Sequence, residues 1–233
     1  MQQTKAILVT AVLILAGQLV MAQKVTRNVA SFTGVNLGLP AQLYLKQGNS
    51  PSVVIEASEE VQDRIQTDVK NGVLTIKQND DWKWWNNWSD KKVKIYITNP
   101  TYDHVSVSGS GDIMGQNMLE SRDMYIGVSG SGKVKLDIKV VDLDSKISGS
   151  GNMKLEGSAR NTNLQISGSG NLDAEDLASE SCKVRISGSG NCRVQVDNSL
   201  ESRVSGSGNI YYRGNPEKLS NQSSGSGSIK KIG

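Results

Sequence analysis

The chain has 233 residues and is nearly balanced in charge, with 26 Lys and Arg against 23 Asp and Glu. Charges of both signs are interspersed along it, which argues against a nucleic-acid footprint or a polybasic membrane patch. One histidine, His104, and two cysteines leave little material for a histidine-based triad or a metal centre. We therefore expect no catalytic residue, no metal and no cofactor.

Residues 1–22 have the pattern of a secretory signal peptide. Lys5 supplies a positive n-region, residues 6–20 form an apolar h-region, and Val20-Met21-Ala22 resembles a small-residue cleavage site. An uncleaved membrane anchor is the alternative, but the apolar stretch is short for a span and is interrupted by Gly17-Gln18. We expect an exported protein in the periplasm, on the outer-membrane surface or outside the cell, with no integral membrane segment after cleavage.

Short strands and one helical turn are expected in the region that follows. Asn71-Gly72 lies between the alternating runs 65–69 and 73–77, which is a strong signal for a β-hairpin. Residues 58–64 are the one plausible helical turn, with Ser58 as its N-cap.

A second strand pair is expected between residues 73–77 and 93–97, across a long loop. We interpret residues 23–100 as the atypical β-rich N-terminal cap and first coils of a solenoid, because solenoids need a terminal unit that hides their exposed end. A separate small β domain is the alternative.

The long loop holds all four tryptophans of the chain, which are Trp82, Trp84, Trp85 and Trp88. A Trp-rich polar loop on an exported β scaffold suggests stacking on a glycan or docking on an envelope surface. Folding back as a lid over the solenoid end is the interpretation we favour. The loop is nevertheless the best ligand-binding candidate in the sequence.

The second half of the chain contains a regular repeat. Ser-Gly-Ser-Gly occurs seven times, at residues 108, 129, 148, 167, 187, 205 and 224, so the steps are 21, 19, 19, 20, 18 and 19 residues. A period near 20 indicates a solenoid, and the alternating run before each copy indicates strands. We predict an all-β, right-handed, single-stranded parallel β-helix with coils of about 19 residues, regular over residues 101–233. One inward stack should contain Ile147, Ile166, Ile186 and Val204.

Asn or Asp follows the motif in five of the seven copies. Stacked at equivalent positions, four asparagines should form a structural amide ladder along one corner. They are Asn152, Asn171, Asn191 and Asn209. A calcium site is the weaker alternative, because hard cations prefer charged oxygens and these amides are neutral. The motif serines either keep the corner tight, which we favour, or bind carbohydrate.

The two cysteines, Cys182 and Cys192, flank the fifth motif within one coil. Two cysteines in an exported chain are compatible with a disulfide, and also with two small buried hydrophobic residues. Both interpretations remain open at this stage.

Clustered carboxylates are the only material for an enzyme. The nearest set is Asp173-Ala174-Glu175-Asp176, with Asp142 and Asp144 two coils earlier. Catalytic carboxylates must flank one bond, whereas alternating acids on a coil usually form a solvated face. A polysaccharide-active enzyme is therefore the least favoured of the functions considered.

Several features together resemble one family. They are the leader, Phe32-Thr33-Gly34-Val35, the pair Leu74-Thr75-Ile76 and 93–97, and the serial Ser-Gly-Ser-Gly-(Asp/Asn) coils. The chain resembles the auto-transporter adhesin head GIN domain family, which is common in Bacteroidota. The resemblance implies an exported, right-handed parallel β-helix at the cell envelope.

We accordingly expect a non-enzymatic, adhesin-like binding module for a surface glycan or an envelope protein. A structural or assembly protein of the envelope is the alternative, in which the solenoid edges stack on partner chains.

Overall fold

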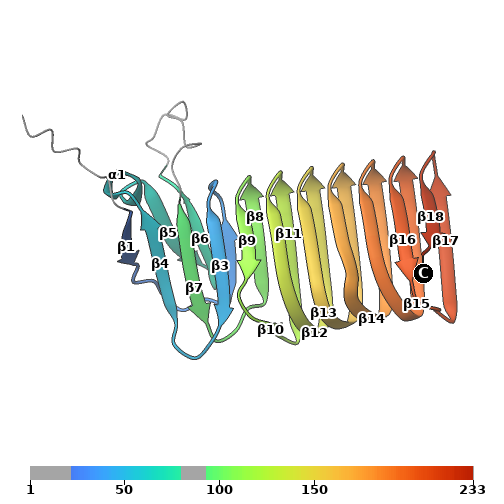
Figure 1. The fold of residues 1–233 in the computed structure, drawn as a ribbon, viewed down its shortest axis with the longest axis horizontal. Helices are drawn as coiled ribbons and strands as arrows, with labels where there is room; N and C mark the ends of the chain where they lie inside the picture. Colours follow the sequence, from blue (N-terminus) through green and yellow to red (C-terminus); the bar gives the residue numbers. More distant parts are fainter. Residues whose placement is uncertain (1–21, 80–92, 233) are drawn as a thin grey trace, which may run out of the picture.

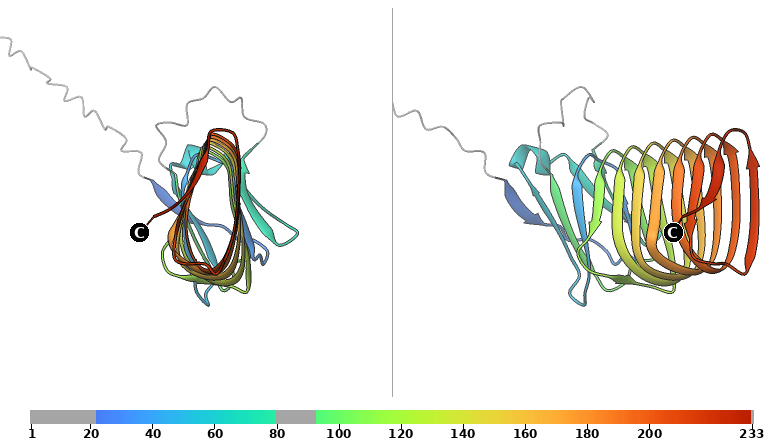
Figure 2. Two further views of the ribbon diagram at one scale, coloured as in Figure 1. Left: turned by 90° about the vertical axis from the view of Figure 1, so that its right-hand side faces the viewer. Right: turned by 45° about the vertical axis from the view of Figure 1, so that its right-hand side comes forward.

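The computed structural model describes residues 22–79 and 93–232, and these form a parallel β-solenoid of about seven turns (Figure 1). Viewed along its axis, the coils superimpose as a narrow closed outline with two long walls (Figure 2). We call the wall whose strands lead into the Ser-Gly-Ser-Gly corners wall A, and the wall that follows those corners wall B. No helix among the described residues is long and apolar enough to cross a membrane.

The regular coils are built from four long strands. Each begins in wall B, bends, and returns along wall A: β12 (Lys133–Gly149), β13 (Asn152–Gly168), β14 (Asn171–Gly188) and β15 (Asn191–Gly206). Neighbouring strands pair in parallel, so residues about 19 positions apart lie side by side. The two-residue β10 (Leu119–Glu120) pairs with β12 near the bend.

The remaining strands extend the two walls. Wall A also contains, along the axis, β5 (Ile65–Lys70), β6 (Val73–Gln78), β2 (Gly34–Leu37), β8 (His104–Gly109), β11 (Asp123–Gly130) and, at the far end, β17 (Lys218–Ser224). Wall B also contains β1 (Gln23–Thr26), β4 (Ser52–Ala57), β7 (Lys94–Asn99), β3 (Gln42–Gln47), β9 (Asp112–Gly115), β16 (Asn209–Arg213) and β18 (Ser228–Lys231). The pairs β5–β6, β1–β4 and β4–β7 are antiparallel, and all of them lie at the N-terminal end.

Two expectations for the N-terminal region are confirmed and one is wrong. The hairpin is β5–β6, and the helical turn is α1 (Glu59–Gln62). The expected pairing of residues 73–77 with 93–97 does not exist, because β6 pairs with β5 and β2 whereas β7 pairs with β3 and β4. The two strands belong to opposite walls, β6 to wall A and β7 to wall B.

The core consists of inward-facing aliphatic columns. Ile147, Ile166, Ile186 and Val204 occupy successive coils in register and are at most 2% exposed, which confirms the predicted stack. Outward-facing residues alternate with them, so each wall presents its own columns of exposed side chains at about 4.8 Å per coil.

The motif glycines close the corners tightly. The first glycine of each motif has a positive φ, for example +116° at Gly168, which other residues rarely adopt. In four of the corners its carbonyl accepts two N–H groups of the next corner, as Gly168 does from Ser189 at 2.9 Å and Gly190 at 3.1 Å. The second glycine is required by space, because a Cβ on Gly170 would lie 2.5 Å from the Gly151 oxygen.

Candidate functional site

A groove of about 440 Å³ follows the outer face of wall A near the N-terminal end. Its floor is one outward column that contains Asn36 of β2, Ser106 of β8 and Gly127 of β11, placed side by side by strand register. One side is formed by a ring column and the other by serines of the motif corners. Lys146 of β12 closes its C-terminal end.

The ring column consists of His104 and Tyr125, which are opposite each other in β8 and β11. Their rings stack with centroids 4.8 Å apart and planes 21° apart. Burial lowers the pKa of His104, and the Asp103 carboxylate opposes this shift. The imidazole is therefore neutral at pH 7. Burial also raises the pKa of Tyr125, with a further contribution from Asp144, so the phenol stays protonated.

The histidine is held by polar contacts. Ser106 Oγ donates to Asn36 Oδ1 at 3.1 Å, and His104 Nε2 lies 3.0 Å from the same hydroxyl. A hydroxyl has one proton, so when Ser106 donates to Asn36 the imidazole Nε2 must donate to Ser106. An imidazole that donates to a serine cannot act as the base that activates it.

Gly127 gives the groove its depth. The following coils place Lys146, Gln165 and Arg185 in the same outward column. Tyr125 leans into the space left at Gly127, where a Cβ would lie 2.9 Å from the phenol oxygen. A single missing side chain thus lets an aromatic ring lie along the wall.

The tryptophans predicted as a ligand-binding loop lie outside the described residues. They are Trp82, Trp84, Trp85 and Trp88. The predicted leader, residues 1–22, also lies almost wholly outside the described residues.

The four predicted ladder asparagines are connected by side-chain hydrogen bonds. Asn171 donates to Asn152 at 3.1 Å, Asn191 to Asn171 at 3.0 Å, and Asn209 to Asn191 at 3.0 Å. Ser228 ends the row by donating its hydroxyl to Asn209 Oδ1 at 2.7 Å. The amides satisfy one another, so they hold the corner and are not vacant ligands for a cation.

Cys182 and Cys192 are free, buried thiols in the structure. Cys182 is in wall A between Thr162 and Leu200, and Cys192 is in wall B between Leu172 and Ile210. Burial raises the pKa of Cys182 to about 12 and that of Cys192 well above its ordinary value. Both thiols are un-ionised at pH 7 and behave as small apolar core residues.

The carboxylates considered for catalysis do not converge on one site. Those of residues 173–176 lie on the outer face of wall B, whereas Asp142 and Asp144 lie on wall A, where they accept hydrogen bonds from Asn161 and Asn163.

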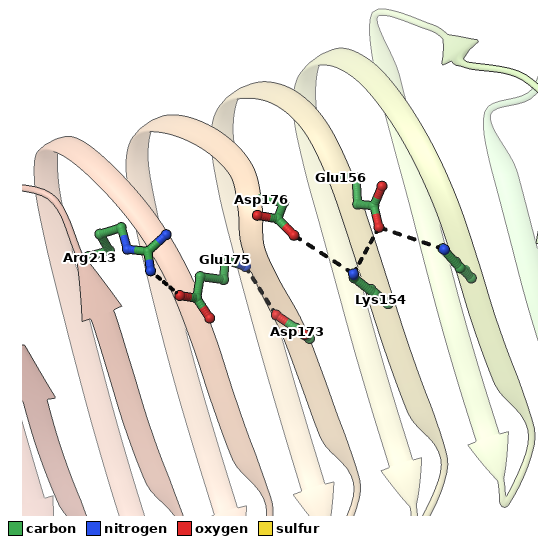
Figure 3. A network of polar contacts seen from close by, with 7 residues as sticks. Lys154, Glu156, Asp173, Glu175, Asp176 and Arg213 are labelled. Carbon is green, nitrogen blue, oxygen red and sulfur yellow. Dashed lines mark hydrogen bonds and ion pairs between the residues drawn. The ribbon is translucent and has the colours of Figure 1, made fainter. Parts of the chain in front are cut away.

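The wall B carboxylates of Glu156, Glu175 and Asp176 face cations, and that of Asp173 accepts a hydrogen bond from the Glu175 backbone N–H at 3.3 Å (Figure 3). Lys154 lies 2.9 Å from Glu156 and 3.7 Å from Asp176, and Arg213 lies 2.5 Å from Glu175. The hydrogen bond from Lys154 lowers the pKa of Glu156. These residues form an ion-paired, solvated face. A general acid needs a raised pKa, whereas that of Glu156 is lowered. Among the described residues no three metal-ligating side chains come together.

The wall A groove was missed by the sequence reasoning. A usable signal exists, because alignment of the repeats on their glycines places Gly127 opposite a polar side chain of every later coil. The same alignment pairs His104 with Tyr125. Asn36 and Thr75 could not be found this way, because β2 and β6 precede the repeats.

Comparisons with known proteins agree with this architecture. Residues 31–216 match the sequence model of the family described as "Putative auto-transporter adhesin, head GIN domain". None of the curated proteins matches the chain.

Solved structures share the fold. A crystal structure of an adhesin candidate from Bacteroides fragilis is 27% identical, with a TM-score of 0.83, over 91% of this chain and 97% of that one. A candidate lipid-binding protein from Parabacteroides distasonis is 23% identical with a TM-score of 0.73, and an adhesin candidate from Parabacteroides merdae is 18% identical with a TM-score of 0.70. Each of these two also covers 91% of this chain and 97% of its own, and at these identities they support the fold alone.

Proposed function

Because the chain belongs to the auto-transporter adhesin head GIN domain family, we propose that it is an exported, non-enzymatic binding module of the cell envelope. Its partner is a surface glycan or an envelope protein. The solenoid serves as a rigid support whose outer columns carry the contacts.

The observation that carries this proposal is the wall A groove. It combines two stacked rings with polar side chains on a flat, fully paired β-sheet. Such a surface is pre-organised, since strand pairing fixes each side chain before a partner arrives and lowers the ordering cost of binding. The ion-paired state of the wall B carboxylates favours binding over hydrolysis.

The four loop tryptophans belong to the same proposal as a second contact. Indoles offer a large apolar surface together with one N–H donor, which suits both sugars and proteins. The wall A groove is lined by described residues, among which no tryptophan occurs.

The experiment measures binding of residues 23–233 to outer-membrane and surface-polysaccharide fractions of Bacteroides fragilis, the source of the similar adhesin candidate. Saturable binding without release of reducing sugar ends is expected. A variant with all four loop tryptophans changed to alanine measures how much of the binding depends on these tryptophans. Absence of binding by the folded protein, or catalytic release of sugar, would contradict the proposal.

A further inference from the structure

We infer that the wall A groove binds an acidic linear oligosaccharide, which lies along the solenoid axis and places a carboxylate on Lys146. This rests on the proposed binding function and deepens it by naming the site and the class of ligand. The site contains only described residues.

The shape of the groove selects a linear ligand. It runs across the strands from β6 through β2, β8 and β11 to β12, which is four steps of about 4.8 Å, or about 19 Å in all. Its two sides are parallel rows, with the rings on one side and Ser108, Ser129 and Ser148 on the other. The serine row repeats with each coil, whereas the rings are confined to β8 and β11, so the groove offers hydroxyls along its length and an apolar contact at its centre.

The polar groups suit a ligand rich in hydroxyls. The hydroxyl groups of Tyr125, Ser129 and Ser148 have no hydrogen-bond partner within residues 22–79 and 93–232. Each of them can donate and accept a hydrogen bond, which is the capacity a sugar hydroxyl needs. The Asn36 oxygen is engaged by Ser106 and Ser108 at 3.1 and 3.3 Å, so its amide group remains as a donor.

The ring column supplies the apolar contact. His104 and Tyr125 lie along the wall over Ser106 and Gly127, as shown by the 3.0 Å His104–Ser106 contact and the approach of Tyr125 to Gly127. Because His104 is neutral, both rings can contact the C–H groups of a sugar without a charge that requires solvation.

Charge then selects an acidic member of the class. Among the described residues that line the groove, Lys146 alone carries a charge, since His104 is neutral. Within the described chain no carboxylate lies within ion-pair distance of its ammonium. Asp144, on the same strand, accepts a hydrogen bond from Asn163 at 3.2 Å. A ligand carboxylate can form a charge-assisted hydrogen bond with this exposed lysine at the end of the groove.

The test uses residues 23–233 on an array of linear oligosaccharides of two to six sugars, in neutral and uronic-acid forms. Gly127→Gln is the decisive variant, because it introduces the side chain that Gln165 has two coils later, and its Cβ, 2.9 Å from the Tyr125 ring, fills the floor and displaces that ring. Lys146→Gln removes only the charge. Tyr211→Ala is the matched control, since Tyr211 is a partly exposed tyrosine of wall B beside Arg193.

We expect binding to uronic-acid oligosaccharides, a loss of at least tenfold in affinity in Gly127→Gln and about tenfold in Lys146→Gln, and no change in Tyr211→Ala. Binding only to neutral oligosaccharides, or binding that survives Gly127→Gln in a protein with unchanged thermal unfolding, would overturn the inference. If either of these two overturning results is found while the protein still binds envelope fractions, the site is wrong and the proposed function stands. If both forms of binding are absent, both fail.

Discussion

The two glycines of each motif are required for different physical reasons, and alanine substitutions can separate them. Gly109 has a φ of +126° but open space around its Cβ position, whereas Gly170 has an ordinary φ and no space. Gly168 combines both constraints, with a φ of +116° and a Cβ position 2.5 Å from the Gly149 oxygen.

The expected costs follow from these geometries. A non-glycine residue in a sparsely populated backbone region loses about 1–3 kcal/mol, so Gly109→Ala should lower the free energy of unfolding by that amount. Overpacking costs about 1–3 kcal/mol, which is the expectation for Gly170→Ala, whose methyl would also meet Ile147 Cγ2 at 2.5 Å. Gly168→Ala should lower the free energy of unfolding by roughly the sum of the two costs, about 2–6 kcal/mol. Ser169→Ala, at an exposed position between the two glycines, should change stability by less than about 0.5 kcal/mol.

Urea unfolding followed by circular dichroism measures these differences through the transition midpoint and its slope. Solenoids can unfold coil by coil, so the slope must match that of the wild-type protein before free energies are compared. A Gly170→Ala protein as stable as Ser169→Ala would refute the close approach of successive corners. A Gly168→Ala cost no larger than that of Gly109→Ala would refute the additive reasoning.

Three further predictions concern the core, the thiols and the ladder. Ser145 is buried with no hydrogen-bond partner for its hydroxyl in the described structure, so Ser145→Val should raise the free energy of unfolding by about 1 kcal/mol; a decrease in urea midpoint would contradict this. The folded-state pKa of Cys182, about 12, lies above the ordinary value of 9.0. The contribution of this thiol to the free energy of unfolding is therefore complete below pH 9 and is lost as the pH rises toward 12. At pH 10 the free energy of unfolding should therefore be lower by about 1.4 kcal/mol in the wild-type protein, a decrease that Cys182→Ala does not show. An equal dependence of the free energy of unfolding on pH in the two proteins would argue against a buried thiol. Asn191→Ala removes the hydrogen bonds to Asn171 and from Asn209 and should cost about 1 kcal/mol in thermal unfolding, whereas no change would mean that the ladder is only a surface arrangement.

The regular coils could be predicted from the sequence because their period is local information. Once Ser-Gly-Ser-Gly is aligned, the register of Ile147, Ile166 and Ile186 follows, and the stacking of the asparagines follows with it. The physical reason is that a parallel solenoid places residues one period apart at strand spacing, so the repeat length alone fixes the neighbours.

The N-terminal region could not be predicted in the same way, since spatial order and chain order differ there. Along wall A, β2 lies between β6 and β8, although it precedes both in the chain. Hydrophobic alternation identifies each strand, but it carries no information about which distant strand is its partner. The wrong pairing of residues 73–77 with 93–97 has this origin.

The groove was hidden for a related reason. Its floor and one end come from β2 and β6, whose neighbours are set by long-range pairing, and its depth comes from the absence of a side chain at Gly127. The ion pairs that join different coils on wall B were hidden as well, because they depend on register and on side-chain reach. Glu175 and Arg213, for example, are 38 positions apart in the sequence.

The most direct test of a ligand site on wall A is the amide NMR spectrum of residues 23–233 titrated with a uronic-acid oligosaccharide. Perturbed signals concentrated in residues 104–108, 125–129 and 146–148 would place the ligand in the groove. Signals that move mainly in wall B or in the tryptophan segment, with residues 104–148 unchanged, would contradict it.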